Sequence, residues 1–200
     1  MLIHNWAILV VVSLFAFSTQ ATDIKENNAI EVAVKQASEA APEHIVKNAS
    51  FMRFAHGKFN IIKAGTNDFT CLVVHEPNGR YEPSCFNKPA MKSVFFSYQM
   101  HMKYLYMGYD AKQTHQKLVQ AFQLGELPKP ETGSLVYMMS RNNRNYVHHT
   151  KTLRKGVPHQ MYFYPKLADE TFSLGGHSSK HWPALWQGFP AMSALIVPVQ

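Results

Sequence analysis

The stretch ASFMRFAHGKFNIIKAGTNDFTCLVVH (residues 49–75) sets the fold class expected for this chain of 200 residues. Its apolar runs are rich in Phe, Ile and Val, which favour strands. Between the runs lie His56-Gly57 and the segment from Gly65 to Asp68, which contain the Gly, Asn and Asp residues typical of turns. The stretch therefore predicts a three-stranded β-meander, with strands at 49–54, 58–64 and 68–75.

Two longer helices are predicted after the meander. The first has a stripe of apolar residues three and four positions apart, at Met91, Val94, Phe95, Tyr98, Met102 and Leu105. Gly108 ends this helix, and Asp110 can cap the second one, which ends at Gly125. The apolar face of the second helix consists of Ala111, Leu118, Val119 and Phe122. Two shorter helices are expected before the meander, at 28–40 and 42–47.

Further strands are predicted in the second half of the chain, at 134–140, 160–164 and 194–199. The remaining segments are expected to be a loop at 76–83, a long loop or loose hairpin tip at 141–156, and an irregular stretch at 166–190 with a short helix at 178–185. Strands, then helices, then strands predict an α+β fold. It would have a mainly antiparallel sheet of about five to six strands, two central helices packed on that sheet, and one disulfide.

The first 21 residues are predicted to be a signal peptide. Ile8 to Phe17 is an apolar run with a single Ser in it, and the small residues Thr19 and Ala21 precede the expected cleavage site. An uncleaved membrane anchor is the alternative, because the N-terminal region has no Lys or Arg. Residues 22–200 would form a single α+β domain without a transmembrane segment, in the periplasm or secreted.

Cys71 and Cys85 are the two cysteines of the chain, and both lie in the part expected to be exported. An oxidising compartment and an even count favour a disulfide between them. The loop that it closes is short, so the bond should stabilise the fold by about 3 kcal/mol. A reactive or metal-binding thiol is the alternative, but a second cysteine so close would tend to oxidise it.

The chain has a formal net charge of +7, and cations are concentrated in one segment. That segment contains Arg141, Arg144, Lys151, Arg154 and Lys155, with His148 and His149 among them. The planar guanidinium of Arg suits phosphate and carboxylate groups. The segment therefore predicts a site for a small molecule or an anionic envelope ligand, with a solvated basic surface as the alternative. Nucleic acid is the least expected partner, because no recognised nucleic-acid-binding module is present.

Five segments of the chain form a recognisable set and span roughly residues 40 to 165. They are Ala41-Pro-Glu-His-Ile45, Ala64-Gly-Thr-Asn-Asp-Phe-Thr-Cys71, Pro83-Ser-Cys85, Leu135-Val-Tyr-Met-Met-Ser140 and Pro158-His-Gln-Met161. Together they resemble a family of small secreted bacterial proteins of unknown function. That family has a Gly-Thr-Asn-Gly-aromatic-Thr-Cys segment, a second Cys after Pro, and a Pro-His-x-Met segment. Asp68 stands where the family has Gly, and residues 166–200 have no counterpart. The resemblance implies export, a disulfide and a role for His159, but no reaction.

His159 is the residue that both the local pattern and the resemblance single out. Pro158 restricts the backbone before it, and alternation should place Met161 and Phe163 on its face of the strand. A buried histidine needs a hydrogen-bond partner, which we expect to be the turn at Gly65–Asn67. A catalytic His159 would instead need a carboxylate, and the candidates are Asp68, Glu76, Glu82 and Asp169.

The histidines also allow a metal site as an alternative. His177 and His181 are four residues apart, so on a helical turn they would share one face. With His148 or His149 and His159, they could bind zinc (Zn) or, with Met, copper (Cu). The aromatic residues Trp182, Trp186 and Phe189 could floor a pocket for a sugar ring or pack in the core.

The function expected from these observations is that of an exported protein that binds a small or anionic ligand. The predicted ligand-binding residues are Asn67, Arg144, His148, His149, Arg154 and His159. No nucleophile elbow, P-loop, dinucleotide fingerprint or His-Glu-x-x-His motif is present, so an enzyme is the less favoured class. The alternatives are a hydrolase that uses His159, a Zn- or Cu-binding protein, and a structural envelope component.

Overall fold

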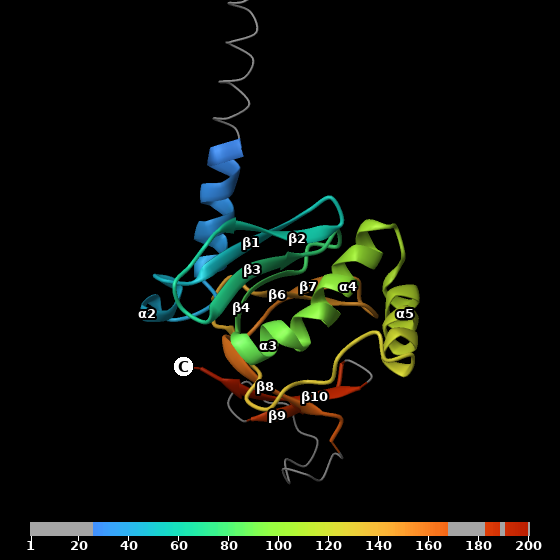
Figure 1. Cartoon of the computed structure of the whole chain (residues 1–200). Helices are drawn as coiled ribbons and strands as arrows, with labels where there is room; N and C mark the ends of the chain where they lie inside the picture. The colour runs from blue at the N-terminus through green and yellow to red at the C-terminus, as the bar shows by residue number, and fades with distance from the viewer. Residues whose placement is uncertain (1–25, 168–182, 189–190, 200) are drawn as a thin grey trace, which may run out of the picture.

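The computed structural model describes residues 26–167, 183–188 and 191–199, so the predicted signal peptide lies outside the described residues. The described part contains a ten-stranded sheet with helices packed on it (Figure 1). The strands are β1 (Ser50–Ala55), β2 (Lys58–Lys63), β3 (Phe69–His75), β4 (Tyr81–Asn87), β5 (Leu135–Met138), β6 (Arg144–Val147), β7 (Thr152–Lys155), β8 (His159–Pro165), β9 (Ala184–Trp186) and β10 (Met192–Pro198). Their order is β2-β1-β3-β4-β5-β8-β10-β9, and the β6–β7 hairpin is joined to β4 through β6. The predicted α+β class and mainly antiparallel sheet are confirmed, but the sheet has more strands than the five to six predicted.

The first three strands do not form the predicted meander. β1 and β2 pair antiparallel, but β3 lies on the other side of β1 and runs parallel to it. The connection between β2 and β3 crosses the start of β1, where a Cβ atom on Gly65 would lie 2.2 Å from the carbonyl carbon of Ala49. The backbone amides of Thr66 and Asn67 donate to the carbonyl oxygen of Asn48, at 2.8 and 3.0 Å. This segment is therefore a close-packed crossover and not a hairpin turn.

The segment 76–83, expected to be a loop, enters the central strand β4 at Tyr81. β4 is buried along almost its whole length, because hydrophobic clusters cover both faces of the sheet there. One edge of β4 pairs with β3, and the opposite edge pairs with two different strands, one on each side of Pro83. This arrangement allows a proline in a central strand. β4 pairs with β6 at Tyr81 and with β5 at Cys85, so Pro83 has no ladder partner on that edge that would need its missing N–H group.

The helices largely follow the predictions. They are the N-terminal helix (residues 26–38), α2 (Glu43–Val46), α3 (Lys88–Lys92), α4 (Val94–Tyr106) and α5 (Ala111–Gln123). Asp110 forms a capping box with Gln113 at the start of α5, and Gly108 and Gly125 follow α4 and α5 with positive φ. The predicted first long helix is divided into α3 and α4 at Ser93. No helix in the described part of the chain is long and apolar enough to cross a membrane.

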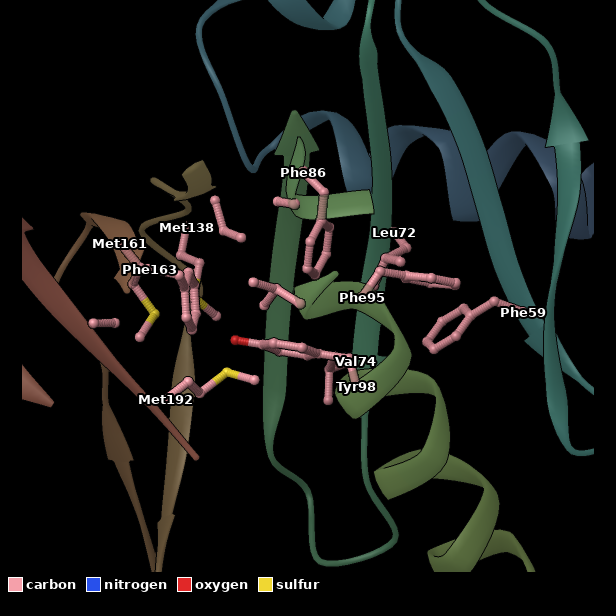
Figure 2. Close-up of a cluster of buried hydrophobic side chains, with 14 of the residues drawn as sticks. Phe59, Leu72, Val74, Phe86, Phe95, Tyr98, Met138, Met161, Phe163 and Met192 are labelled. Atoms are coloured by element: carbon pink, nitrogen blue, oxygen red, sulfur yellow. The ribbon is translucent and has the colours of Figure 1, made fainter. Parts of the chain in front are cut away.

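Two hydrophobic clusters lie on opposite sides of the first half of the sheet. The larger cluster packs against α3 and α4 and includes Leu72, Phe86, Val94, Phe95, Tyr98, Met102, Met138, Met161, Phe163 and Met192. Figure 2 shows Tyr98 between the aromatic side chains of this cluster and its methionines. The smaller cluster packs against the N-terminal helix and includes Ala37, Ala40, Phe51, Cys71 and Cys85. The predicted apolar stripe of α4 is thus confirmed as a core face.

Cys71 and Cys85 form the predicted disulfide. They lie opposite each other in the β3–β4 ladder, so the bond links two adjacent central strands. Both cysteines are fully buried in the smaller cluster, next to residues of the N-terminal helix. A buried disulfide is compatible with an extracellular location.

Strand β9 lies at the end of the segment where a short helix was predicted, and residues 178–182 of that segment lie outside the described residues. Leu185, in the predicted helix at 178–185, belongs to β9 and pairs with β10. The ring of Trp186 packs edge-to-face on Phe163, with 6.3 Å between ring centroids, so Trp186 contributes to the core. Outside the described residues lie the other two members of the predicted aromatic cluster, Trp182 and Phe189.

Candidate anion-binding groove

A groove of about 660 Å³ lies between the β6–β7 hairpin, the start of β4 and the end of the N-terminal helix. Its volume is within the range of about 300–1,000 Å³ typical of small-molecule sites. The described residues that line it are Gln36, Glu39, Tyr81, Arg141, Asn142, Asn143, Arg144, Leu153, Arg154 and Lys155. Eight of these ten side chains are charged or amides, so the groove suits a polar ligand.

The β6–β7 hairpin and the turn before it place four cations at the groove: Arg141, Arg144, Arg154 and Lys155. Arg144 pairs with Lys155 in the hairpin register, and Arg154 lies opposite Asn145. Arg141 is in the turn that precedes β6. Residues opposite each other on antiparallel strands have adjacent side chains on one face. Two positive side chains, those of Arg144 and Lys155, are therefore neighbours across the hairpin.

Among the described residues, these four cations have no carboxylate partner. None of them forms an ion pair within the described residues, although the same residues include five ion pairs elsewhere. The guanidinium of Arg144 lies 5.4 Å from the centre of the Tyr81 ring, and all four cations are exposed. Like charges directly opposite each other destabilise a sheet. An anion bound in the groove would relieve this repulsion.

Glu39 supplies the one carboxylate among the described lining residues. Its Oε2 atom accepts hydrogen bonds from Ser140 Oγ at 2.6 Å and from Asn142 Nδ2 at 2.9 Å. The backbone amide of Met139 donates to the carbonyl oxygen of Ala40 at 2.9 Å. These bonds attach the end of the N-terminal helix to the turn before β6. The other carboxylate oxygen, Oε1, has no protein partner in the described part of the chain, and Glu39 is half-buried.

Tyr81 lies beside both Glu39 and Arg144. Burial raises the pKa of its phenol to about 12, the negative charge of Glu39 adds to the rise, and the positive charge of Arg144 opposes it. The phenol is therefore neutral at physiological pH and can donate or accept a hydrogen bond. One end of the groove thus has a carboxylate, a neutral hydroxyl and a guanidinium close together.

The predicted basic residues Arg144 and Arg154 line the groove, but His148 and His149 do not. Both histidines lie in the turn that joins β6 to β7, and the ring of His148 packs edge-to-face on Tyr146 with 5.1 Å between centroids. Glu39 and Tyr81 also line the groove but were not predicted as site residues. They come from distant parts of the chain, and no local pattern connects them to the basic segment.

His159 is the first residue of β8 and does not line the groove. Its Nδ1 atom donates to the carbonyl oxygen of Val157 at 2.7 Å. The residue is half-buried. Met161 and Phe163 are buried in the core, as the strand alternation predicted. His159 has no ion-pair partner among the described residues, so the carboxylate that a catalytic role requires is not supplied there.

The side chain of Asn67 forms hydrogen bonds that hold the crossover between β2 and β3 in place. Its Nδ2 atom donates to the carbonyl oxygen of Ile45 at 2.7 Å, and its Oδ1 atom accepts from the backbone amide of Phe69 at 3.0 Å. The predicted hydrogen bond between His159 and the 65–67 segment is not formed within the described residues. Both polar atoms of the Asn67 side chain instead hold the chain path around the start of β1.

The carboxylates considered as partners of His159 bind other residues. Glu76 and Glu82 both pair with Arg80, with N···O distances of 2.8 and 2.6 Å. Asp68 lies 3.3 Å from the ammonium group of Lys88 on the exposed surface. The fourth candidate, Asp169, lies outside the described residues.

Glu76, Arg80, Glu82 and His101 form a charged network around two buried glutamates, which was not among the sequence-based predictions. His101 Nε2 lies 2.8 Å from the same Glu76 oxygen that Arg80 contacts, and the two glutamates are 5% and 6% exposed. The network joins the β3–β4 connection to α4. The spacing of two acids around Arg80 was a local signal for an ion pair, but the contribution of His101 depends on how α4 packs.

The described residues do not assemble the predicted metal site. They contain no group of three or more His, Cys, Asp or Glu side chains that could hold a metal ion. His177 and His181 lie outside the described residues, so the zinc or copper alternative stays a prediction for them.

Comparison of the chain with protein-family models, with curated proteins and with solved structures found no match. The resemblance to a family of small secreted bacterial proteins therefore stays a prediction. A function for this chain has to be argued from the groove.

Proposed function

We propose that this protein is an exported binding protein whose groove at the β6–β7 hairpin takes a small anionic ligand. The observation that carries the proposal is the group of four exposed cations that line one groove without an ion-pair partner in the described chain. Arg and Lys donate charge-assisted hydrogen bonds to phosphate and carboxylate oxygens, and these bonds are among the stronger ones in proteins.

The groove also differs from an ordinary basic surface in its construction. Glu39 is held by hydrogen bonds from Ser140 and Asn142, and Tyr81 lies beneath the guanidinium of Arg144. The groove walls therefore come from the N-terminal helix, β4 and the hairpin, three parts of the chain that fold together. A solvated basic loop would need no such enclosure.

Binding of inorganic tripolyphosphate, followed by isothermal titration calorimetry, tests the proposal. Replacement of Arg144, Arg154 and Lys155 by Ala should weaken binding by about a hundredfold, because several charge-assisted hydrogen bonds are lost. Binding by the unsubstituted protein should also weaken steeply as the NaCl concentration rises, because salt screens exposed charges.

A matched variant separates the groove from net charge alone. Replacement of the exposed lysines Lys103, Lys112 and Lys129 by Ala removes the same number of charges from α4, α5 and the segment after α5. This variant should bind tripolyphosphate nearly as tightly as the unsubstituted protein. Equal weakening in both triple variants would mean that the hairpin is only part of a diffuse basic surface.

Export is the second part of the proposal. The apolar run before Ala21 and the Cys71–Cys85 disulfide support it. Expression of the full chain in a bacterial host, followed by N-terminal sequencing of the protein from the periplasm or medium, should give Thr22 as the first residue. Protein that stays in the cytoplasm and begins at Met1 would contradict export.

A further inference from the structure

We infer that the groove binds a carbohydrate that carries phosphate or carboxylate groups: Glu39 accepts a sugar hydroxyl while the hairpin cations bind the anionic groups. This inference rests on the proposed function and specifies its ligand class. It starts from the presence of a fixed carboxylate inside a groove that is otherwise cationic.

Glu39 is oriented as an acceptor for a ligand. Ser140 and Asn142 both donate to Oε2, so the carboxylate group has a defined position, and Oε1 has no partner in the described chain. A carboxylate at this place repels a ligand that is anionic over its whole surface, such as polyphosphate. It therefore favours a ligand that combines anionic groups with hydrogen-bond donors.

The donor that faces Glu39 is better supplied by a hydroxyl than by an amine. An ammonium group there would lie in the same groove as Arg141, Arg144, Arg154 and Lys155, and their positive charges would repel it. A neutral hydroxyl has no such cost. Like charges thus oppose the binding of polyamines and weaken, without preventing, the binding of bare polyanions.

The remaining lining residues fit hydroxyl groups. The Gln36 and Asn142 amides and the neutral Tyr81 phenol can each donate or accept a hydrogen bond. Leu153 is the single aliphatic residue among the described lining residues, so the groove has no continuous aliphatic surface for an acyl chain. The chemistry of the groove therefore matches a polyhydroxylated anion, in which hydroxyls and anionic groups alternate over short distances.

The test compares acidic sugars with a bare polyanion in a variant that alters Glu39 alone. In Glu39→Gln, the amide oxygen can still accept the bonds from Ser140 and Asn142, but the charge is gone. Affinity for trigalacturonate and for glucose 1-phosphate should fall at least about tenfold, the usual effect of losing a hydrogen bond to a charged acceptor. Affinity for tripolyphosphate should stay equal or rise, because a repelling charge is removed.

Glu31→Gln is the matched control, since Glu31 lies on the same N-terminal helix, is exposed and does not line the groove. It carries the same charge change and should leave the affinity for all three probes nearly unchanged. Thermal unfolding of both variants shows whether the fold is kept.

A measurement on the unsubstituted protein makes the test independent of any variant. Trigalacturonate with its hydroxyls O-methylated keeps its carboxylates but cannot donate to Glu39, so it should bind at least about tenfold more weakly than trigalacturonate. Equal affinity for the two forms would overturn the inference, and so would a Glu39→Gln variant that binds the sugars more tightly. In either case, binding of tripolyphosphate would still support the anion-binding groove. Failure of all anionic probes to bind would overturn the proposed function itself.

Discussion

Glu76 Oε1 lies 2.8 Å from His101 Nε2, across the contact between the β3–β4 connection and α4. Burial by itself raises the pKa of the Glu76 carboxyl, but the hydrogen bond from His101 and the charge of Arg80 outweigh it. The pKa therefore falls from its ordinary value of 4.5 to about 2. A carboxylate that is more acidic in the folded protein than in the unfolded chain links stability to pH.

The network should make the protein sensitive to acid. The contribution of Glu76 to stability is complete above its ordinary pKa of 4.5 and is lost as the pH falls from there towards 2. This pKa difference corresponds to about 3 kcal/mol. Urea unfolding at a series of pH values should show the loss. In Glu76→Gln this part of the pH dependence should disappear, and the stability at pH 7 should fall by about 3 kcal/mol.

Glu43 provides the control for this prediction, because it is exposed at the start of α2. Glu43→Gln should keep the acid sensitivity of the unsubstituted protein. If Glu76→Gln lost stability between pH 4.5 and 2 as steeply as the unsubstituted protein, the linkage would have to be assigned to other carboxylates.

Gly65→Ala should destabilise the protein strongly. The added Cβ atom would lie 2.2 Å from the carbonyl carbon of Ala49, so the crossover between β2 and β3 must move away from β1. We expect a loss of at least about 3 kcal/mol in the free energy of unfolding, at the upper end for overpacking. Gly133→Ala is the matched control: Gly133 has φ +80° but open space around it, so the cost should be about 1 kcal/mol. Equal losses of stability in the two variants would mean that the close approach of Gly65 to Ala49 does not determine the cost of the substitution.

The disulfide should be complete and should contribute to stability. Thiol titration of the unfolded, non-reduced protein should detect no free thiol, because Cys71 and Cys85 are bonded to each other. The double variant Cys71→Ala/Cys85→Ala should lose about 3 kcal/mol in the free energy of unfolding, as expected for a loop of this length. Two reactive thiols per unfolded chain would contradict the bond.

Asn67→Ala and His159→Ala should separate a structural residue from a peripheral one. Asn67→Ala leaves Ile45 O and Phe69 N without their partner, which should cost about 2–3 kcal/mol in thermal or urea unfolding. His159→Ala removes one hydrogen bond from a half-buried ring and should cost about 1 kcal/mol or less. Neither residue lines the groove, so both variants should bind tripolyphosphate normally. If His159→Ala lost tripolyphosphate binding but kept its stability, His159 would have to be counted as a ligand-binding residue.

Part of this molecule could be predicted from local sequence patterns. The apolar stripe of α4, the capping box at Asp110 and the glycines after α4 and α5 depend only on residues within a few positions of each other. The pairing of Cys71 with Cys85 followed from a count of two. The cation cluster was also visible, because Arg144 and Arg154 lie in one short segment that a hairpin brings together.

β4 was hidden because its sequence contradicts the usual signs of a strand. Glu82, Pro83 and Ser84 favour a loop, yet all three are buried in a central strand. Arg80 compensates the charge of Glu82, and the change of edge partner around Pro83 removes the need for its N–H group. Both compensations come from neighbours that only the folded chain provides.

The sequence by itself determined the helices before residue 125 except for the break at Ser93, the disulfide pair and the position of the basic segment, because each depends on residues close together in the chain. Only the tertiary structure decided that β3 runs parallel to β1 and that Glu39 enters the groove. Glu39 reaches it through a hydrogen bond from Ser140, 101 residues further along the chain. Contacts over such separations depend on how much apolar surface the helix and the sheet bury together and on how the charges on these surfaces are paired. Both are set only when the helix and the hairpin pack on the same sheet.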